Sequence, residues 1–146
     1  MNTSLTRRDV LAGLAASATA PGAAFAAGEP AYDDWLIIDA LCFGREWGED
    51  VYAALRAANY SGIIESLPRR NLQTAIDALV EWRTRVGENP DKLILALRAA
   101  DFETAQKSGR TAVMMNFQDT IMLEGDVDNV DALHALGMRC AQLTYN

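Results

Sequence analysis

From Trp35 onward, short apolar runs alternate with longer segments in which apolar residues recur every three or four positions. The short runs have the length of buried strands, and the longer segments have the period of amphipathic helices. Strands alternating with helices predict an α/β fold, with a parallel sheet and crossover helices. The expected strands lie at 36–38, 62–66, 92–96, 111–117 and 140–145, and the expected helices at 50–59, 71–85, 101–108 and 128–136.

The ends of several helices are marked by capping residues. The longest helix has a continuous apolar stripe, and Asn71 is placed to cap its first turn. Asp101 and Asp128 are the expected N-caps of the two later helices. Gly109 and Gly137 are expected to end those helices, because glycine accepts the left-handed backbone that follows a last turn.

The order of elements leaves two architectures open. The first strand candidate, Leu36-Ile37-Ile38, has no polar face, which is typical of a parallel strand covered on both sides. The sequence reaches Asn146 directly after the fifth expected strand. A complete TIM-type (β/α)8 barrel requires eight strands and about 250 residues. The pattern therefore predicts either a small open α/β domain or the N-terminal portion, about five βα units, of such a barrel.

The first 26 residues differ in kind from the rest of the chain. The pair Arg7-Arg8 precedes an Ala-rich apolar run, and Ala24-Phe25-Ala26 supplies the small residues of a cleavage site. These features predict a twin-arginine signal peptide over 1–26 and export to the periplasm. A membrane anchor is the alternative, although Gly13 and the Pro21-Gly22 pair interrupt a run that is short for a span.

We expect a polar leader at 27–34 and one domain at 35–146, with no later segment long enough to span a membrane. Half of the residues are hydrophobic, 23% are charged, and the formal net charge is −7, which fits a globular protein with an acidic surface. Such a surface repels phosphate, so no nucleic acid partner is expected. We expect Cys42 and Cys140 to lie at opposite faces of a barrel and to stay unbonded.

Three stretches carry a resemblance to a known family. They are the first strand with its Ile38-Asp39 pair, the segment 90–101 (PDKLILALRAAD), and the segment 108–146, which begins SGRTAVMMNF. In order and spacing they resemble the membrane dipeptidase family, the renal-dipeptidase-like metallopeptidases. The matching positions in the last two stretches are Pro90, Asp91, Leu93, Asp101, Gly109, Ala112, Val113, Leu133, Leu136, Gly137, Arg139, Leu143 and Thr144.

The resemblance implies a barrel of the metallo-dependent-hydrolase kind, often found as a homodimer, that cleaves dipeptides with two zinc ions. In such a site the metals hold a bridging hydroxide, which attacks the carbonyl carbon of a small peptide or amide substrate. The ligands in the family include a His-x-Asp pair on the opening strand, a bridging Glu after a later strand and two further His residues. Another His, which follows the Leu-Thr pair, binds substrate.

The family's ligand positions hold other residues here. The His-x-Asp pair falls on Leu41 and Phe43, the bridging Glu on Gln118, and the substrate-binding His on Tyr145. Leu and Phe have no lone pair for a metal, and a neutral amide does not offset the repulsion between two cations. The two remaining His ligands would lie past the printed sequence. We therefore expect this chain to bind no zinc itself and, taken alone, to be an inactive fragment.

The family-equivalent positions that remain as catalytic candidates are Gln118, Tyr145 and Asp39, of which Asp39 supports the site in the family pattern. Gln118 either contacts a bound ligand or makes a turn. Asp119 is one residue from the lost carboxylate, but a shift of one residue on or just after a strand turns the side chain the other way. Cys42 is either a nucleophile or a small buried thiol, and the lack of a nearby His favours the thiol.

Other charged residues have mainly structural interpretations. His134, the only His, is expected on an outer helix facing away from the barrel mouth. The acidic group Glu46, Glu49 and Asp50 is expected in a solvated loop and a first helical turn, with a weak cation site as the alternative. The pair Arg69-Arg70 is expected in solvent, or in contact with a substrate carboxylate.

Two functions remain open from the sequence. One is hydrolysis of dipeptides or related amides by the complete protein, with metal ligands from outside this chain or a different apparatus. The other is a catalytically silent periplasmic barrel that binds ligand or serves a structural role. Five barrel strands leave two open edges, which predicts poor solubility of the mature part alone.

Overall fold

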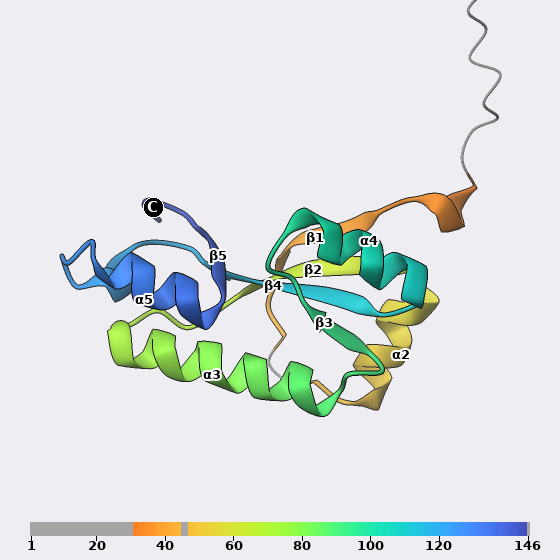
Figure 1. Ribbon diagram of the computed structural model, residues 1–146, viewed down its shortest axis with the longest axis horizontal. Helices are drawn as coiled ribbons and strands as arrows, with labels where there is room; N and C mark the ends of the chain where they lie inside the picture. The colour runs from red at the N-terminus through yellow and green to blue at the C-terminus, as the bar shows by residue number, and fades with distance from the viewer. Residues whose placement is uncertain (1–30, 45–46, 146) are drawn as a thin grey trace, which may run out of the picture. The chain divides into compact units, whose positions relative to one another are not determined.

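The computed structural model of the chain describes residues 31–44 and 47–145 (Figure 1). The predicted signal peptide and Glu46 therefore lie outside the described residues. In chain order the elements are η1 (Tyr32–Asp34), β1 (Ile37–Cys42), α2 (Glu49–Ala57), β2 (Tyr60–Ser66), α3 (Leu72–Glu88), β3 (Leu93–Leu95), α4 (Ala99–Ser108), β4 (Thr111–Phe117), η2 (Ile121–Leu123), α5 (Asn129–Leu136) and β5 (Met138–Ala141).

Among the described residues the strands form one parallel sheet, as the alternating pattern predicts. Strand β4 lies beside β2, although β3 comes between them in the sequence. The short β3 pairs with the first half of β4, through Leu93 and Thr111, and β5 pairs with its second half, through Met115 and Met138. The strands β1, β2, β4 and β5 are therefore consecutive neighbours, as in a barrel, and β3 is a short addition beside β4.

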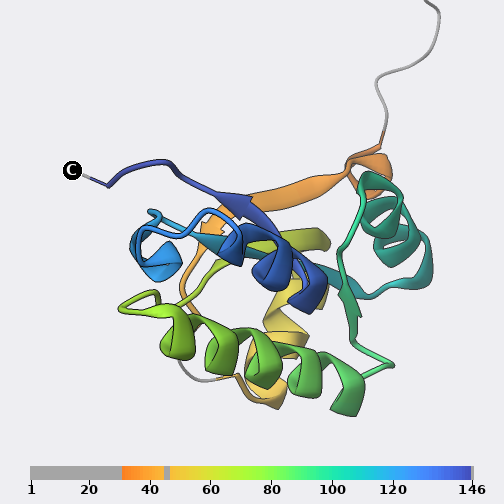
Figure 2. The same cartoon turned by 60° about the vertical axis from the view of Figure 1, so that its left-hand side comes forward.

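Helices cover both faces of this sheet. Helices α3 and α5 lie side by side on one face (Figure 2), where Ile63, Leu79 and Phe117 belong to the larger core. Helix α4 lies on the other face, where Phe102, Ala105 and Ala112 form a smaller core. We call these the α3 face and the α4 face.

Gly62 explains how closely α4 approaches the sheet. A Cβ atom at this position would lie 2.3 Å from the ring of Phe102 and 3.0 Å from the carbonyl oxygen of Ala112. Any other residue would therefore push α4 away from β2. Helix α4 joins β3 to β4 and packs on both β2 and β4, so it covers the place where these two strands pair directly.

The capping predictions meet mixed outcomes. Asn71 caps α3 as predicted, accepting a hydrogen bond of 2.8 Å from the Thr74 backbone N–H, and Gly109 and Gly137 end their helices with left-handed backbones. Asp128 holds the N-cap position of α5 but makes no capping hydrogen bond. Asp101 was wrongly predicted as the N-cap of α4, because the helix begins two residues earlier. Its carboxylate instead accepts the N–H groups of the preceding turn.

The prediction that the first strand is covered on both sides is also wrong. In β1, Ile38 is 38% exposed and Leu41 is 45% exposed. Strand β1 is an edge of the described sheet, and α4 packs mainly on β2, β3 and β4. An apolar run signals burial, but it does not say whether the covering layer lies within the same part of the chain.

Candidate functional site

The carboxyl ends of β1, β2, β4 and β5 meet at one edge of the sheet, where barrel enzymes place their chemistry. Register fixes which side chains meet there. Cys42 is paired with Glu65, Ser66 with Asn116, and Asn116 with Cys140. We call this edge the mouth.

The two faces of the sheet present different chemistry at the mouth. Successive residues of a strand point to opposite faces, so Glu65 shares the α3 face with Ile63, while Ser66 shares the α4 face with its register partner Asn116. The α3 face therefore carries a carboxyl group at the mouth, and the α4 face carries a hydroxyl group and an amide.

The polar group on the α4 face is buried and incompletely bonded. Ser66 is 8% exposed and Asn116 is 4% exposed. Within the part of the chain that the structure describes, Ser66 Oγ and Asn116 Oδ1 have no hydrogen-bond partner. Gln118, the first residue past β4, is 5% exposed. Buried polar atoms without partners cost about 1–3 kcal/mol each, so they need a ligand or an ordered water.

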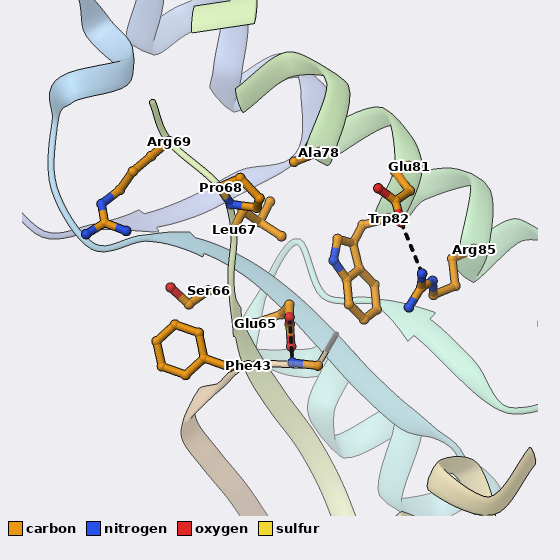
Figure 3. A pocket seen from close by; sticks show the side chains of 11 residues that line it. Phe43, Glu65, Ser66, Leu67, Pro68, Arg69, Ala78, Glu81, Trp82 and Arg85 are labelled. Carbon is orange, nitrogen blue, oxygen red and sulfur yellow. Dashed lines mark hydrogen bonds and ion pairs between the residues drawn. The ribbon is translucent and has the colours of Figure 1, made fainter. Parts of the chain in front are cut away.

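A pocket of about 370 Å³ opens at the mouth between β2 and α3 (Figure 3). Phe43 and Ser66 lie at one side of it, and Trp82 and Arg85 of α3 lie at the other (Figure 3). Its volume falls within the range of small-molecule sites.

Glu65 is the most buried acid in this pocket, at 3% exposure. Both of its carboxyl oxygens accept from the Gly44 backbone N–H, at 3.0 and 3.2 Å. Burial raises the pKa of Glu65 to about 7, against the lowering effect of hydrogen bonds from Gly44 and the Cys42 thiol and of the nearby Arg85 charge. Near neutral pH this group is therefore present in both protonated and charged forms.

The thiol of Cys42 is hydrogen-bonded to the Glu65 carboxyl group. Burial, the neighbouring Glu65 charge and the hydrogen bond to Glu65 raise the pKa of the Cys42 thiol to about 12. A thiolate is the reactive form of cysteine, so the raised pKa of the half-buried Cys42 disfavours a role as nucleophile.

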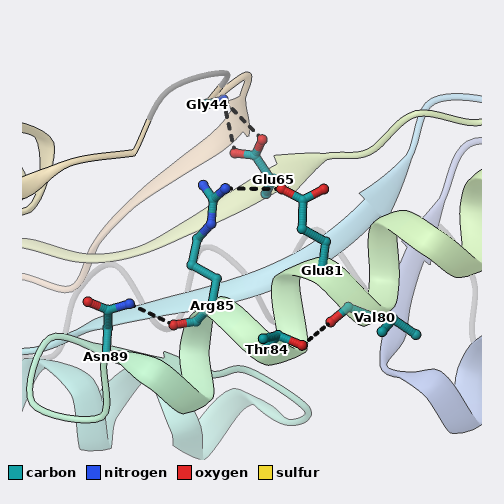
Figure 4. Close-up of polar contacts among 7 residues, drawn as sticks. All are labelled: Gly44, Glu65, Val80, Glu81, Thr84, Arg85 and Asn89. Carbon is teal, nitrogen blue, oxygen red and sulfur yellow. Dashed lines mark hydrogen bonds and ion pairs between the residues drawn. The ribbon is translucent and has the colours of Figure 1, made fainter.

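On the α3 side of the pocket lies Arg85, and one nitrogen of its guanidinium group has no acceptor among the described residues. Arg85 Nη2 donates to Glu81 Oε1 at 3.1 Å, and its guanidinium lies 4.7 Å from the ring centroid of Trp82. Figure 4 shows this pair beside the carboxyl group of Glu65. In the described part of the chain, Arg85 Nη1 is buried without a hydrogen-bond partner.

The sequence suggested that Arg69 is solvated, but the structure shows it bonded to other residues. Its Nε donates to Asp119 Oδ2 at 2.5 Å, and its guanidinium lies 5.2 Å from the ring centroid of Tyr145. Asp119 also accepts from the Ile121 backbone N–H. The bonds from Arg69 and from the Ile121 N–H hold the Asp119 carboxylate in the loop after β4.

The structure separates the three catalytic candidates. Asp39 lines a different pocket with Val51 and Leu55 of α2, and its Oδ1 accepts from the Leu41 backbone N–H at 2.9 Å. Gln118 lies at the mouth end of β4, and Tyr145, which is 57% exposed, lies against Arg69.

The zinc ions that the family uses do not fit the donors present at the family-equivalent positions. Leu41 and Phe43 end in carbon atoms and are 45% and 60% exposed, and Gln118 offers only a neutral amide. Over residues 31–44 and 47–145, no group of three or more His, Cys, Asp or Glu side chains is placed to hold a metal ion.

The remaining sequence candidates lie away from the mouth or are bonded elsewhere. His134 is exposed on α5. Glu49 and Asp50 lie in the first turn of α2, as expected, and Glu49 pairs with Lys92.

Cys42 and Cys140 are free, as predicted, but the reason given from the sequence was wrong. Both lie at the mouth, because Cys42 pairs with Glu65 of β2 and Cys140 pairs with Asn116 of β4, next to each other in register. Three strand spacings, about 14 Å, separate β1 from β5, which is too far for a disulfide.

Sequence reasoning missed Glu65, Ser66, Asn116 and Arg85. The signal for the first two was the end of an apolar run in two polar residues, IIES, directly before Leu67-Pro68. The pairing of Ser66 with Asn116 depends on β2 lying beside β4, which no local pattern announces.

The described part of the chain is a parallel α/β sheet whose strands end together at one mouth, which is the arrangement expected of part of a TIM-type barrel. Comparison with solved structures supports this fold. An amidohydrolase from Pseudomonas aeruginosa aligns with a TM-score of 0.72 and 20% identity over 78% of this chain and 35% of that protein. The probable dipeptidase PvdM from the same organism aligns with a TM-score of 0.58 and 19% identity, over 75% of this chain and 34% of PvdM. The chain thus spans about a third of the length of both.

Residues 43–146 match the sequence profile of the membrane dipeptidases, peptidase family M19. The chain therefore belongs to the membrane dipeptidase family, as its motifs indicated. The search of curated proteins gave no match. In the part of the chain described, every helix falls short of the length and hydrophobicity that a membrane span requires.

Proposed function

We propose that this chain forms part of the ligand-binding mouth of a membrane-dipeptidase-type barrel that recognises a small peptide or amide through hydrogen bonds. In this proposal the barrel does not hydrolyse the ligand at a two-zinc centre. Family membership supports the class of ligand. The substitutions at Leu41, Phe43 and Gln118 support the loss of the metals, since none of these side chains replaces an ionised ligand.

The observation that carries the proposal is the pair of unpartnered atoms on the α4 face. Asn116 Oδ1 is an acceptor, and the Ser66 hydroxyl both donates and accepts. A peptide group offers one N–H donor and one carbonyl acceptor, and so satisfies both. The family's own ligand chemistry and the groups present at this mouth thus agree on an amide-containing molecule.

A second candidate is hydrolysis by the complete protein. It is favoured by membership of a metallopeptidase family and by the span of the chain, which is about a third of its solved relatives. It requires metal ligands from outside the described residues, or another source of the nucleophile.

Calorimetric titration of the full chain with alanyl-alanine tests the proposal. We expect binding, no release of alanine, and an affinity that falls about tenfold in Ser66→Ala and in Asn116→Leu, the worth of one hydrogen bond. Ser108→Ala, an exposed serine on α4, is the control and should bind like the unchanged chain. Release of alanine that depends on added zinc would establish the second candidate instead.

We also propose that the protein is exported through the twin-arginine route. The support is the sequence of residues 1–26, with Arg7-Arg8 before an apolar run and a small-residue cleavage site. Replacing both arginines by lysine should leave the full chain in the cytoplasm of a bacterial host, while the unchanged chain reaches the periplasm. Equal distribution of the two would refute this route.

A further inference from the structure

The strands present no charged side chain on the α4 face of the sheet. Strands β1, β2 and β4 contain two charged residues, Asp39 and Glu65. Asp39 is paired in register with Ile63, and Glu65 comes two residues after Ile63 on β2, so both carboxyl groups lie on the α3 face. On the α4 face these three strands therefore offer a ligand hydrogen bonds and apolar contacts, but no charge.

Strand β1 contributes apolar side chains to the same face at the mouth. Cys42 is paired with Glu65 on the α3 face. Leu41 and Phe43, one residue before and one residue after Cys42, therefore point to the α4 face. Leu41 is 45% exposed and Phe43 is 60% exposed, so both can contact a bound molecule. We call these two side chains the apolar strip.

The apolar strip lies next to the polar pair of Ser66 and Asn116. Phe43 and Ser66 line the same side of the pocket at the mouth, away from α3 (Figure 3). Strand β2, which carries Ser66, lies between β1 and β4, which carries Asn116. Both polar side chains are more than nine-tenths buried, and within the described residues Ser66 Oγ and Asn116 Oδ1 have no partner. A ligand bonded to this pair therefore has the strip at its side.

The types of donor and acceptor set the direction in which an amide binds. Asn116 Oδ1 can only accept, so it takes the amide N–H, and the Ser66 hydroxyl is left to donate to the amide carbonyl oxygen. The carbonyl carbon then lies on the side of β1. On the other side, the register partner of Asn116 is Cys140 of β5, which is a shorter side chain than Leu41 or Phe43. The substituent on the carbonyl carbon is therefore the one that meets the apolar strip.

We propose that the α4 side of this mouth binds an uncharged secondary amide with an aliphatic acyl chain. The amide group bonds Ser66 and Asn116, and the acyl chain lies along Leu41 and Phe43. This inference rests on the proposed function, because it uses the same hydrogen-bonding pair. It adds that the ligand is recognised by an apolar chain on its carbonyl carbon. Each methylene group covered on one side by the strip should raise the affinity about twofold, half of the free energy of complete burial.

Two amides of the same composition test this direction of binding. N-methylheptanamide carries its apolar chain on the carbonyl carbon, and N-hexylacetamide carries its chain on the nitrogen. In calorimetric titration of the full chain, N-methylheptanamide should bind at least about fivefold more tightly than its isomer. Because the two isomers are equally apolar, nonspecific hydrophobic binding would not separate them.

Substitutions in the strip and in the polar pair have different expected effects. Leu41→Asn and Phe43→Ala should each reduce the preference for N-methylheptanamide, and the double substitution should abolish it. Val80→Asn, at an exposed apolar position on α3, is the matched control and should keep the preference. Ser66→Ala should weaken the binding of both isomers by the same factor and leave their ratio unchanged. Circular dichroism of each variant shows that a lost preference does not come from unfolding.

The outcomes separate this inference from the proposed function. If the two isomers bind equally and Ser66→Ala weakens both, the role of the strip is refuted and amide recognition at the mouth stands. A preference that survives the double substitution of Leu41 and Phe43 also refutes the strip, because the acyl chain then lies elsewhere. If neither isomer nor alanyl-alanine binds, both proposals fall.

Discussion

At the scale of single residues, Glu65 is a buried carboxyl group whose neutral form the folded chain favours. It is 3% exposed and accepts a hydrogen bond from the Gly44 N–H, just past the end of β1. Its pKa is raised to about 7, mainly by burial. A carboxyl group with a raised folded-state pKa keeps its proton longer in the folded chain than in the unfolded chain. Between pH 4.5 and about 7 the unfolded state therefore binds fewer protons, and stability falls as pH rises.

Glu65→Gln should remove this pH dependence. A shift from 4.5 to about 7 corresponds to a loss of about 3 kcal/mol across that window, whereas Gln stays neutral and still accepts from Gly44. Urea denaturation at intervals from pH 4 to 8 measures the difference between the two chains. Glu88→Gln, at the exposed end of α3, is the control and should keep the full slope. A slope unchanged in Glu65→Gln would show that Glu65 titrates normally.

At the scale of elements, Arg69 ties the exit of β2 to the exit of β4. Its contacts to Asp119 and Tyr145 bring together segments that lie about fifty and more residues apart in the sequence. The Asp119 side chain is 8% exposed, so losing Arg69 would leave a buried charge without its partner.

Arg69→Ala should therefore destabilise the chain by about 3 kcal/mol. Arg70→Ala, the exposed neighbour, should change stability by less than about 0.5 kcal/mol. Chemical denaturation of both variants measures the contrast. Adding Asp119→Asn to Arg69→Ala should recover part of the loss, because the unpaired charge is removed. Equal effects of the two arginine substitutions would mean that the ion pair contributes nothing.

Replacing a glycine by alanine should have opposite effects on stability at Gly137 and at Gly87. Gly137 ends α5 with φ +115°, and a Cβ atom there would lie 2.6 Å from Met115 Cε. Gly137→Ala should cost about 1–3 kcal/mol. Gly87, inside α3, has nothing within 4 Å of such an atom, so Gly87→Ala should stabilise by about 0.5–1 kcal/mol. Thermal melts of the two variants should move in opposite directions, and a shift in the same direction would contradict this account.

The elements themselves were predictable because their signals are local. The strand at 111–117 has the bounds of β4, and Asn71 caps α3, since an apolar run and a capping residue each act within a few positions. The neighbour of β2 was not predictable. That β4 and not β3 pairs with it is a long-range pairing that follows from no local run of residues. The same holds for the site. The position of Gln118 at a strand end was predictable from the local pattern, whereas the Ser66–Asn116 pair was not, because it depends on the order of the strands.

At the scale of the whole molecule, the described sheet leaves apolar side chains of β1 and its flanks uncovered. Leu36, Ile38, Leu41 and Phe43 are between 38% and 60% exposed. Apolar side chains gathered along an edge strand favour association with other chains. These side chains are a physical reason for the poor solubility that the sequence predicts.

Leu41→Lys should make the full chain less prone to associate, because a charge on an edge strand opposes strand pairing. Size-exclusion chromatography with light scattering over a range of concentrations measures the effect. Val80→Lys, at an exposed position on α3, is the control and should associate like the unchanged chain. A chain that is already monomeric at high concentration would contradict the expectation.

The central claim is that hydrogen-bonding groups at this mouth have taken over a task that relatives of the family give to zinc. Native mass spectrometry of the full chain with alanyl-alanine, in the presence of a chelator and then of added zinc, tests it most directly. The account predicts a one-to-one peptide complex that forms in the chelator and that zinc neither joins nor strengthens. A peptide complex that forms only when one or two zinc ions are bound to the chain would contradict it.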